Sequence, residues 1–368
     1  MTYLVRKISG LQWSLMALVL LLGVFGIFAI YSATWMREQD FWSRQLVWLI
    51  IGVLICFGVS LTDYRWIRRG AVPLYLAGLL GLLITHFFGE TVYGARSWLD
   101  FGFFSFQPSQ LAIVSAIMVM ALFLSDYESM PPPLRIALCA VIAAVPGILI
   151  LIQPDLGSAI VWVPVILAML YVARIPARYL LTMILLALAI IPLVVNFGLR
   201  PYQRLRIITF LDPELDPRGA GWTINQSLTA IGSGGWDGKG FKAENTLNEL
   251  GFLPSTIVHN DFIFSVIGEQ HGFLGGALLL LAFIALIGLA LNISLHAGDD
   301  LGRLLGVGLT TLLFTHTFMN IGMTIGVTPI TGLPLPLVSY GGSFLLTVMF
   351  SIGILQSIWL HRRRQGGR

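Results

Sequence analysis

Residues 12–34, QWSLMALVLLLGVFGIFAIYSAT, contain no charged side chain. A helix that crosses the hydrocarbon of a bilayer needs about 20 mostly apolar residues, so this stretch predicts a transmembrane helix. It is too long for the apolar core of a signal peptide and lacks a cleavage site of small residues. We therefore expect it to remain in the protein as the first membrane span.

Charged residues along the rest of the chain are separated by similar gaps. The last gap, Arg303 to Arg362, is long enough for two spans and is divided by a cluster of prolines. With 57% hydrophobic and 11% charged residues, the chain is predicted to be an all-α integral membrane protein, one polytopic domain over residues 1–368. We expect about ten spans, at 12–34, 45–62, 71–89, 106–125, 136–153, 157–173, 179–198, 262–293, 304–327 and 340–361, with a long extracytoplasmic loop at 199–261.

Lysine and arginine are distributed unequally between the two predicted faces. Short cytoplasmic loops retain an excess of these residues. With the N-terminus in the cytoplasm, thirteen fall in cytoplasmic segments and three, Arg37, Arg44 and Arg96, in short external loops. Both termini are therefore expected in the cytoplasm, and the basic tail at 361–368 is expected to contact anionic membrane lipids. The net charge of +4 is mostly an orientation signal and does not indicate nucleic-acid binding.

Three carboxylates lie at or near the predicted external boundary. Asp261 opens the run DFIFSVIGE, whose remaining residues enter the bilayer. Desolvation on one side raises the proton affinity of such a carboxylate and suits it to act as a general base, although a helix cap is the alternative. Glu269 lies about two turns deeper and either has a function or pairs with a cation such as Arg96. Asp155, in a tight turn, either caps the next helix or contacts the long loop.

The long loop carries cations that could bind a pyrophosphate group. Arginine does so through two parallel hydrogen bonds and lysine as a point charge. The alternative is that each is a solvated loop charge of little consequence. The segment GSGGWDGKG at 232–240 lacks the pattern of a nucleotide-binding loop. The candidate pyrophosphate ligands in the loop are Arg204, Arg206, Lys239 and Lys242.

Short motifs run through the chain in one order: IYSA at 30–33, GARSWL at 94–99, QPS at 107–109, QPDLGS at 153–158, FLDP at 210–213, GSGG at 232–235, HNDFIF at 259–264 and GLPLPLVSYGGS at 332–343. By these motifs the chain resembles, nearly end to end, the SEDS family of bacterial cell-wall proteins. Gly238-Lys239-Gly240 and the Pro334/Pro336 spacing are more similar to its elongation branch than to its division branch. The motifs add Ser233, His259 and Arg96 as candidate substrate-binding residues, and Gln153, Gln110 and Tyr340 as supporting ones.

The resemblance implies an inverting peptidoglycan glycosyltransferase that polymerises lipid II during elongation and shape maintenance. The family's essential external aspartate falls on Asp261, which would take the proton of the acceptor's GlcNAc 4-hydroxyl as it attacks the donor's MurNAc anomeric carbon. Undecaprenyl pyrophosphate would leave, steadied by cations or by a divalent metal, Mg or Mn. The implied partner is a class B penicillin-binding protein, whose single transmembrane helix would pack against late spans.

The chain departs from the family pattern in span four. Gln110 and Ile113 stand where the family usually has Glu and Lys, so an ion pair is predicted to be lost. Two other functions remain open, a flippase for lipid-linked precursors and a non-catalytic scaffold for a penicillin-binding protein. The concentration of charge at the external face favours chemistry over transport, whereas the changes in span four keep the scaffold open.

Overall fold

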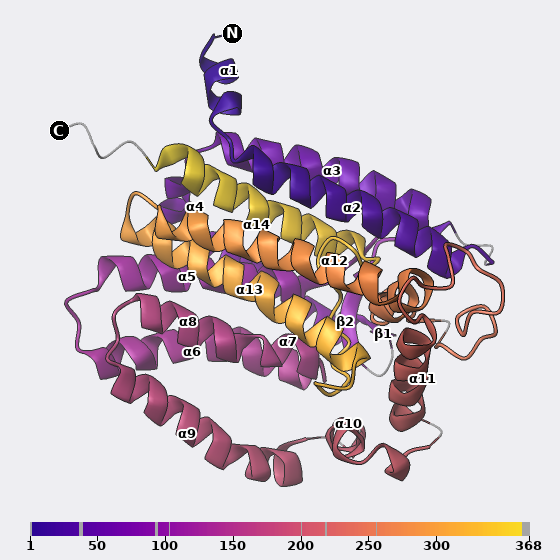
Figure 1. Ribbon diagram of the computed structural model, residues 1–368. Coiled ribbons are helices and arrows are strands. Elements are labelled where there is room, and N and C mark those ends of the chain that lie inside the picture. The colour runs from indigo at the N-terminus through magenta and orange to yellow at the C-terminus, as the bar shows by residue number, and fades with distance from the viewer. Residues whose placement is uncertain are drawn as a thin grey trace.

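The computed structural model describes residues 2–36, 40–92, 95–102, 104–199, 201–217, 219–254 and 256–362. Arg37 and residues 363–368 of the basic tail lie outside this part of the chain. Long helices run roughly side by side through the molecule, and the short helix α1 (Thr2–Ser9) projects away from them (Figure 1).

Nine helices within the described ranges are long and apolar enough to cross a membrane. A tenth apolar segment is broken into α7 (Leu156–Ile160) and α8 (Trp162–Val172). The predicted class, an all-α membrane protein with about ten spans, is confirmed. The nine are α2 (Trp13–Thr34), α3 (Phe41–Leu61), α4 (Ile67–Phe88, preceded by the turn η1, Tyr64–Trp66), α5 (Pro108–Asp126), α6 (Pro132–Ile152), α9 (Ala177–Leu193, continued by η2, Val194–Gly198), α12 (Ile263–Leu295), α13 (Asp300–Thr324) and α14 (Gly342–His361).

Two helices differ from the predicted spans for identifiable reasons. Span 157–173 is interrupted at Val161, because Pro164 has no N–H to donate to the preceding turn. Span 262–293 is not one continuous helix, since Gly272 inside α12 has φ 61° and ψ −162°. A side chain at Gly272 would place its Cβ 2.4 Å from the backbone nitrogen of Gly238. The break therefore requires glycine because another segment of the chain docks there.

That segment belongs to the long loop. The loop contains α10 (Pro201–Leu211), η3 (Pro213–Leu215) and α11 (Ala220–Ser233), followed by irregular chain. Lys239 N donates to the Glu269 carbonyl at 3.0 Å, and Phe273 N donates to the Gly235 carbonyl at 2.8 Å. These bonds satisfy backbone groups that the interrupted helix leaves unpaired, so the loop is attached to α12 at membrane depth.

A small antiparallel sheet, which was not predicted, joins α4 to α5. Its strands are β1 (Glu90–Val92), β2 (Ala95–Asp100) and β3 (Ser105–Phe106), in the order β1-β2-β3. Leu99 is opposite Phe106 in the pairing of β2 with β3. The sheet places Ser97 and Trp98 at the end of the bundle that the sequence predicts to be external.

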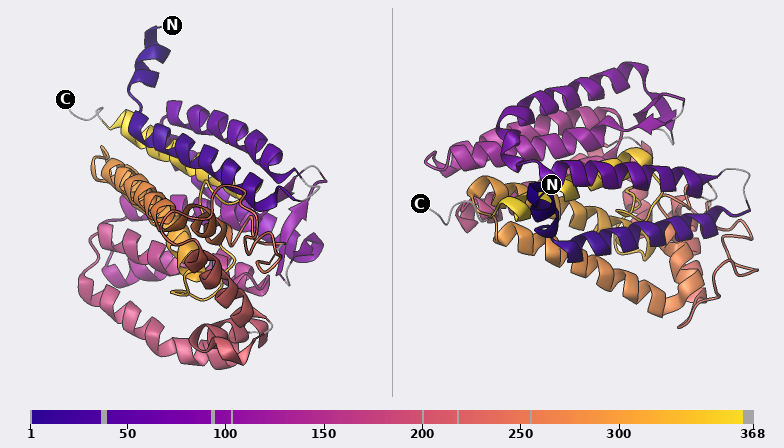
Figure 2. Two further views of the ribbon diagram at one scale, coloured as in Figure 1. Left: turned by 45° about the vertical axis from the view of Figure 1, so that its right-hand side comes forward. Right: turned by 90° about the horizontal axis from the view of Figure 1, so that it is seen from above.

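Helix α13 is central, and α9 is peripheral. In the apolar window of α13, 83% of residues are buried by protein, against 6% for α9. Figures 1 and 2 show α9 at the edge of the molecule. Leu185 and Leu186 of α9 each remain 58% exposed. Because so apolar a surface is unfavourable in water, this distribution is that of a bundle surrounded by lipid.

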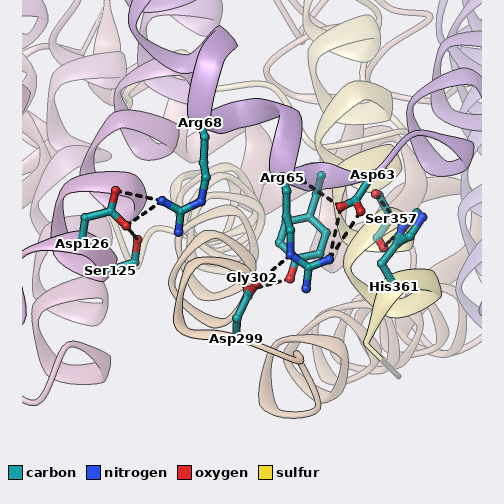
Figure 3. Close-up of polar contacts among 10 residues, drawn as sticks. Asp63, Arg65, Arg68, Ser125, Asp126, Asp299, Gly302, Ser357 and His361 are labelled. Carbon is teal, nitrogen blue, oxygen red and sulfur yellow. Dashed lines mark hydrogen bonds and ion pairs between the residues drawn. The ribbon is translucent and has the colours of Figure 1, made fainter. Parts of the chain in front are cut away.

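Ion pairs between charged side chains connect neighbouring helices at the end of the bundle opposite the sheet. Arg65 Nε donates to Asp299 Oδ2 at 3.0 Å, and Arg68 Nη1 donates to Asp126 Oδ1 at 2.8 Å (Figure 3). The side chain of Asp299 also accepts from Gly302 N and caps α13. The cap explains why α13 begins at Asp300 rather than at the predicted position 304. This is the predicted cytoplasmic end.

Candidate functional site

A cavity of about 230 Å³ lies at the end of the bundle that carries the small sheet, the predicted external end. Segments far apart in the sequence form its wall: β2, the start of α5, the 154–158 turn, α10, the residues before α12, and the 330–341 loop. Five of the residues predicted for the site line this cavity. They are Asp261, Asp155, Arg206, Gln110 and Tyr340.

Asp261 is held in the cavity wall by contacts from two other elements. Its N–H donates to the Ile257 carbonyl at 2.8 Å, and its own carbonyl accepts from Asn320 Nδ2 at 3.0 Å. Gly332, with φ 72°, passes so close that a Cβ there would lie 3.5 Å from Asp261 Oδ2. The backbone of Asp261 is thus fixed while its carboxylate faces the cavity.

Withdrawal from water raises the pKa of Asp261 to about 7. The guanidinium of Arg206 opposes this rise, and the nearby carboxylate of Asp155 adds to it. A carboxyl group with a pKa near 7 is a stronger base than an exposed aspartate and is still ionised in a large fraction of molecules at neutral pH. Its position and basicity suit proton abstraction.

Asp155 has the helix-capping role that its position suggested. It caps α7, since Ser158 N donates to its Oδ1 at 3.0 Å and Ser158 Oγ to its Oδ2 at 2.7 Å. Gln107 Nε2 donates to Oδ2 at 3.2 Å. Burial raises the pKa of Asp155, whereas these hydrogen bonds and Arg206 of the long loop lower it. Asp155 thus caps α7 and lines the same cavity as Arg206.

Only one of the four predicted pyrophosphate ligands, Arg206, is among the described residues that line the cavity. Arg204 donates to Asn196 Oδ1 at 3.1 Å on an exposed surface. Lys242 Nζ donates to the Tyr31 hydroxyl at 2.6 Å and lies 4.0 Å from the centre of that ring. Arg206 is thus the cation placed to meet an anion beside Asp261.

Lys239 and Glu269 form an ion pair away from the cavity. Lys239 Nζ lies 2.7 Å from Glu269 Oε1, which also accepts from Leu247 N at 2.7 Å. Glu269 is fully buried, so the pairing alternative predicted for it is correct, with Lys239 in place of Arg96. Ser233 Oγ lies 3.5 Å from the same oxygen and donates to the Ala230 carbonyl. The pair holds the loop against the broken helix.

The remaining predicted residues lie outside the cavity lining. The His259 ring packs on Phe41, with 4.2 Å between ring centres, and near Tyr340. Arg96 is exposed on β2. Gln153 is buried and donates to the Leu82 carbonyl at 2.7 Å. In this structure these three residues support or flank the site.

Asn320 is a residue that sequence reasoning missed. Its Nδ2 donates to the carbonyls of both Asp261 and Leu333, at 3.0 and 2.7 Å, and so joins two walls of the cavity to α13. It lies 59 positions from Asp261. No local pattern marks it, because the same helix also carries other polar side chains, such as His316 and Thr317.

Span four carries two neutral residues, Gln110 and Ile113, where the family usually has an ion pair, and so buries no unpaired charge there. Gln110 lines the cavity and is 2% exposed, and Ile113 is fully buried in the core. An unpaired charge at either position would be costly in such surroundings. Two neutral side chains avoid that cost.

Comparison with known proteins identifies relatives over nearly the whole chain. The model of the FTSW_RODA_SPOVE family, described as "Cell cycle protein", matches residues 12–364. Peptidoglycan glycosyltransferase MrdB of Escherichia coli K12 is 36% identical over 351 residues, covering 95% of this chain and 94% of that protein. Peptidoglycan glycosyltransferase RodA of Treponema pallidum is 32% identical, covering 96% and 98%.

Solved structures are also similar to this chain over nearly its whole length. One, reported under the heading of structural coordination of polymerization and crosslinking by a peptidoglycan synthase complex, matches with a TM-score of 0.83 and 30% identity, covering 96% of this chain and 99% of that one. The crystal structure of the rod shape determining protein RodA of Thermus thermophilus matches with a TM-score of 0.72 and 28% identity, covering 96% and 98%. The overall arrangement of helices is thus shared with these proteins.

Proposed function

This chain belongs to the FtsW, RodA and SpoVE family of cell cycle proteins, and we propose that it is a peptidoglycan glycosyltransferase of the RodA type in which Asp261 is the general base. The observation that carries the assignment of the base is the placement of Asp261 in the cavity wall, with a pKa of about 7. The relatives named peptidoglycan glycosyltransferase, matched over 95% of this chain or more, support the reaction class.

The substrate is lipid II, as both donor and acceptor. The Asp261 carboxylate takes the proton from the acceptor's sugar hydroxyl, whose oxygen forms a bond to the anomeric carbon of the donor. The bond from that carbon to the pyrophosphate oxygen breaks on the opposite side, so the configuration inverts and undecaprenyl pyrophosphate leaves. Arg206, beside Asp261 in the wall, stabilises the negative charge that develops on the pyrophosphate.

A divalent cation, Mg²⁺ or Mn²⁺, fits this site only together with the substrate. No group of three His, Cys, Asp or Glu side chains that could hold a metal is found among the described residues. Asp155 and Asp261 supply two carboxylates in one cavity, and Mg²⁺ is commonly held by one or two carboxylates plus substrate phosphates. Such an ion would neutralise charge on the leaving group.

The proposed topology places the cavity outside the cytoplasm and both termini inside it. The excess of Lys and Arg in the predicted cytoplasmic segments supports this orientation. A crosslinking partner, a class B penicillin-binding protein, is proposed because a related chain is part of a complex that coordinates polymerization and crosslinking. Activity of the purified chain with and without that partner tests the assignment.

The pKa of Asp261 predicts how the rate depends on pH. The base form is required, so the rate of glycan formation at saturating lipid II should fall about tenfold for each pH unit below 7 and level off above it. The measurement is the initial rate of polymerisation across about pH 5 to 8.5, with recovery after return to neutral pH as the control for stability. A flat profile over this range would exclude Asp261 as the titrating base.

Arg206 should act on both the rate and the pH profile. Its charge lowers the pKa of Asp261 and faces the proposed pyrophosphate, so Arg206→Gln should slow polymerisation about tenfold or more and shift the midpoint of the profile to higher pH. Arg204→Gln, two residues away on the same helix but outside the cavity lining, is the matched control and should leave both quantities unchanged. Equal effects of the two substitutions would contradict this role for Arg206.

A further inference from the structure

Arg135 is a buried guanidinium whose hydrogen-bonding capacity is poorly used. It lies in the first turn of α6 and is 4% exposed. Its Nη2 donates to the Leu124 carbonyl over a long 3.4 Å, and its Nε has no partner. Arginine cannot give up its proton in a protein. A buried charge in this state requires a counter-ion or a strong acceptor.

Other arginines at the same end of the bundle have carboxylate partners. Arg65 pairs with Asp299 and Arg68 with Asp126, as Figure 3 shows. Among the described residues, no carboxylate lies within ion-pair distance of Arg135. Arg135 is nevertheless more deeply buried than the other two. Of these three guanidinium groups, the most deeply buried one therefore has no carboxylate partner among the described residues, and a bound anion could supply the missing acceptor.

Arg135 lines a small pocket with two further arginines, where the ends of α5, α6, α8 and α13 meet. The pocket holds three guanidinium groups, of Arg135, Arg174 and Arg303, against the carboxylates of Glu128 and Asp300, which leaves one positive charge. The Nε of Arg303 is also buried without a partner. The helix dipoles cancel, since two helices begin and two end here, so the side chains decide the charge.

The two ion pairs in this pocket are weak enough for a bound ligand to replace their carboxylates. Arg174 Nη1 lies 3.4 Å from Glu128 Oε1, with the two side chains 71% and 56% exposed. Arg303 pairs with Asp300 three residues earlier on the same helix. Exposed pairs of this kind contribute little. Both arginines are therefore available to a stronger, bidentate acceptor such as a phosphate group.

We propose that Arg135, Arg174 and Arg303 form a binding site for the phosphate of an anionic phospholipid, such as cardiolipin or phosphatidylglycerol, in the cytoplasmic leaflet. The pocket has a volume of about 10 Å³, enough for one oxygen of a phosphate whose remainder lies outside. It lies at the ends of predicted membrane spans, where lipid headgroups are expected, and the neighbouring Leu134 is 46% exposed and could contact an acyl chain. A free phosphate would offer the same oxygens without the chains.

The test is lipid binding by the full-length, delipidated protein in neutral detergent, measured by native mass spectrometry. Titrations use cardiolipin, phosphatidylglycerol and phosphatidylcholine, with inorganic phosphate in a separate arm. We expect the anionic lipids to bind at least about tenfold more tightly than phosphatidylcholine, and Arg174→Gln/Arg303→Gln to lower that affinity about tenfold. Arg135 is kept in this variant so that the packing of α6 is not disturbed.

Arg69→Gln is the matched control, because Arg69 is exposed at the same end of the bundle and is not part of the pocket. It should leave lipid affinity unchanged. Equal losses in the control and the double variant, or no preference for anionic lipid, would overturn the site. Displacement of bound lipid by inorganic phosphate at comparable concentration would assign the pocket to a free anion and overturn the lipid as its source.

Discussion

Asp261→Asn is expected to lower glycan-chain formation from lipid II by about 10²–10⁴-fold. Asparagine keeps the shape of the side chain and the backbone bonds to Ile257 and Asn320, so the cavity should persist. It cannot accept the proton of the acceptor hydroxyl. The measurement is polymer length and yield with purified protein, alone and with its cognate penicillin-binding protein.

The control for this substitution is Asp237→Asn, which makes the same chemical change at an exposed position of the same loop. It should polymerise lipid II at the wild-type rate. Wild-type rates from Asp261→Asn would remove Asp261 from the mechanism. If neither the wild type nor the variant makes polymer with the partner present, the scaffold or flippase functions would replace the glycosyltransferase.

Lys239→Met is expected to destabilise the protein by about 3 kcal/mol, because it leaves the carboxylate of Glu269 buried without its cation. Glu269 is fully buried, whereas the Lys239 side chain is 28% exposed. The partial exposure of Lys239 places the expected loss of stability at the lower end of the range for a broken buried ion pair. Replacing both residues, as Lys239→Met/Glu269→Met, should recover most of the loss because no charge is stranded. The measurement is thermal unfolding in detergent, followed by a thiol-reactive fluorescent dye or by intrinsic tryptophan fluorescence.

Lys242→Met serves as the comparison for the ion pair. This lysine belongs to the same loop but contacts the Tyr31 hydroxyl and ring, and among the described residues no carboxylate lies within ion-pair distance of it. Its loss should therefore shift the unfolding temperature much less than the loss of Lys239. Equal shifts for the two variants, or a double variant as unstable as Lys239→Met alone, would show that the pair does not hold the loop on α12.

Membrane spans were predictable because each one satisfies its backbone within itself and needs only a length of apolar residues. The gaps between charges located α2 and α14 in this way. The break at Val161 follows from Pro164 and was open to prediction, whereas the break at Gly272 depends on a loop that docks from elsewhere. The three-stranded sheet was missed because its strands are short and depend on pairing with each other.

The membrane class, the approximate number of spans and the acidic residues of interest could be predicted from the sequence alone, since lipid imposes a simple rule on charge and length. Which of these charges lie close together could be seen only once the chain was folded. The fold brought Arg206 rather than Lys239 or Lys242 to Asp261, and Asn320 to the carbonyl of the same residue. The reason is physical, because electrostatic interaction depends on distance and desolvation in space, and neither quantity is encoded in the separation of residues along a chain.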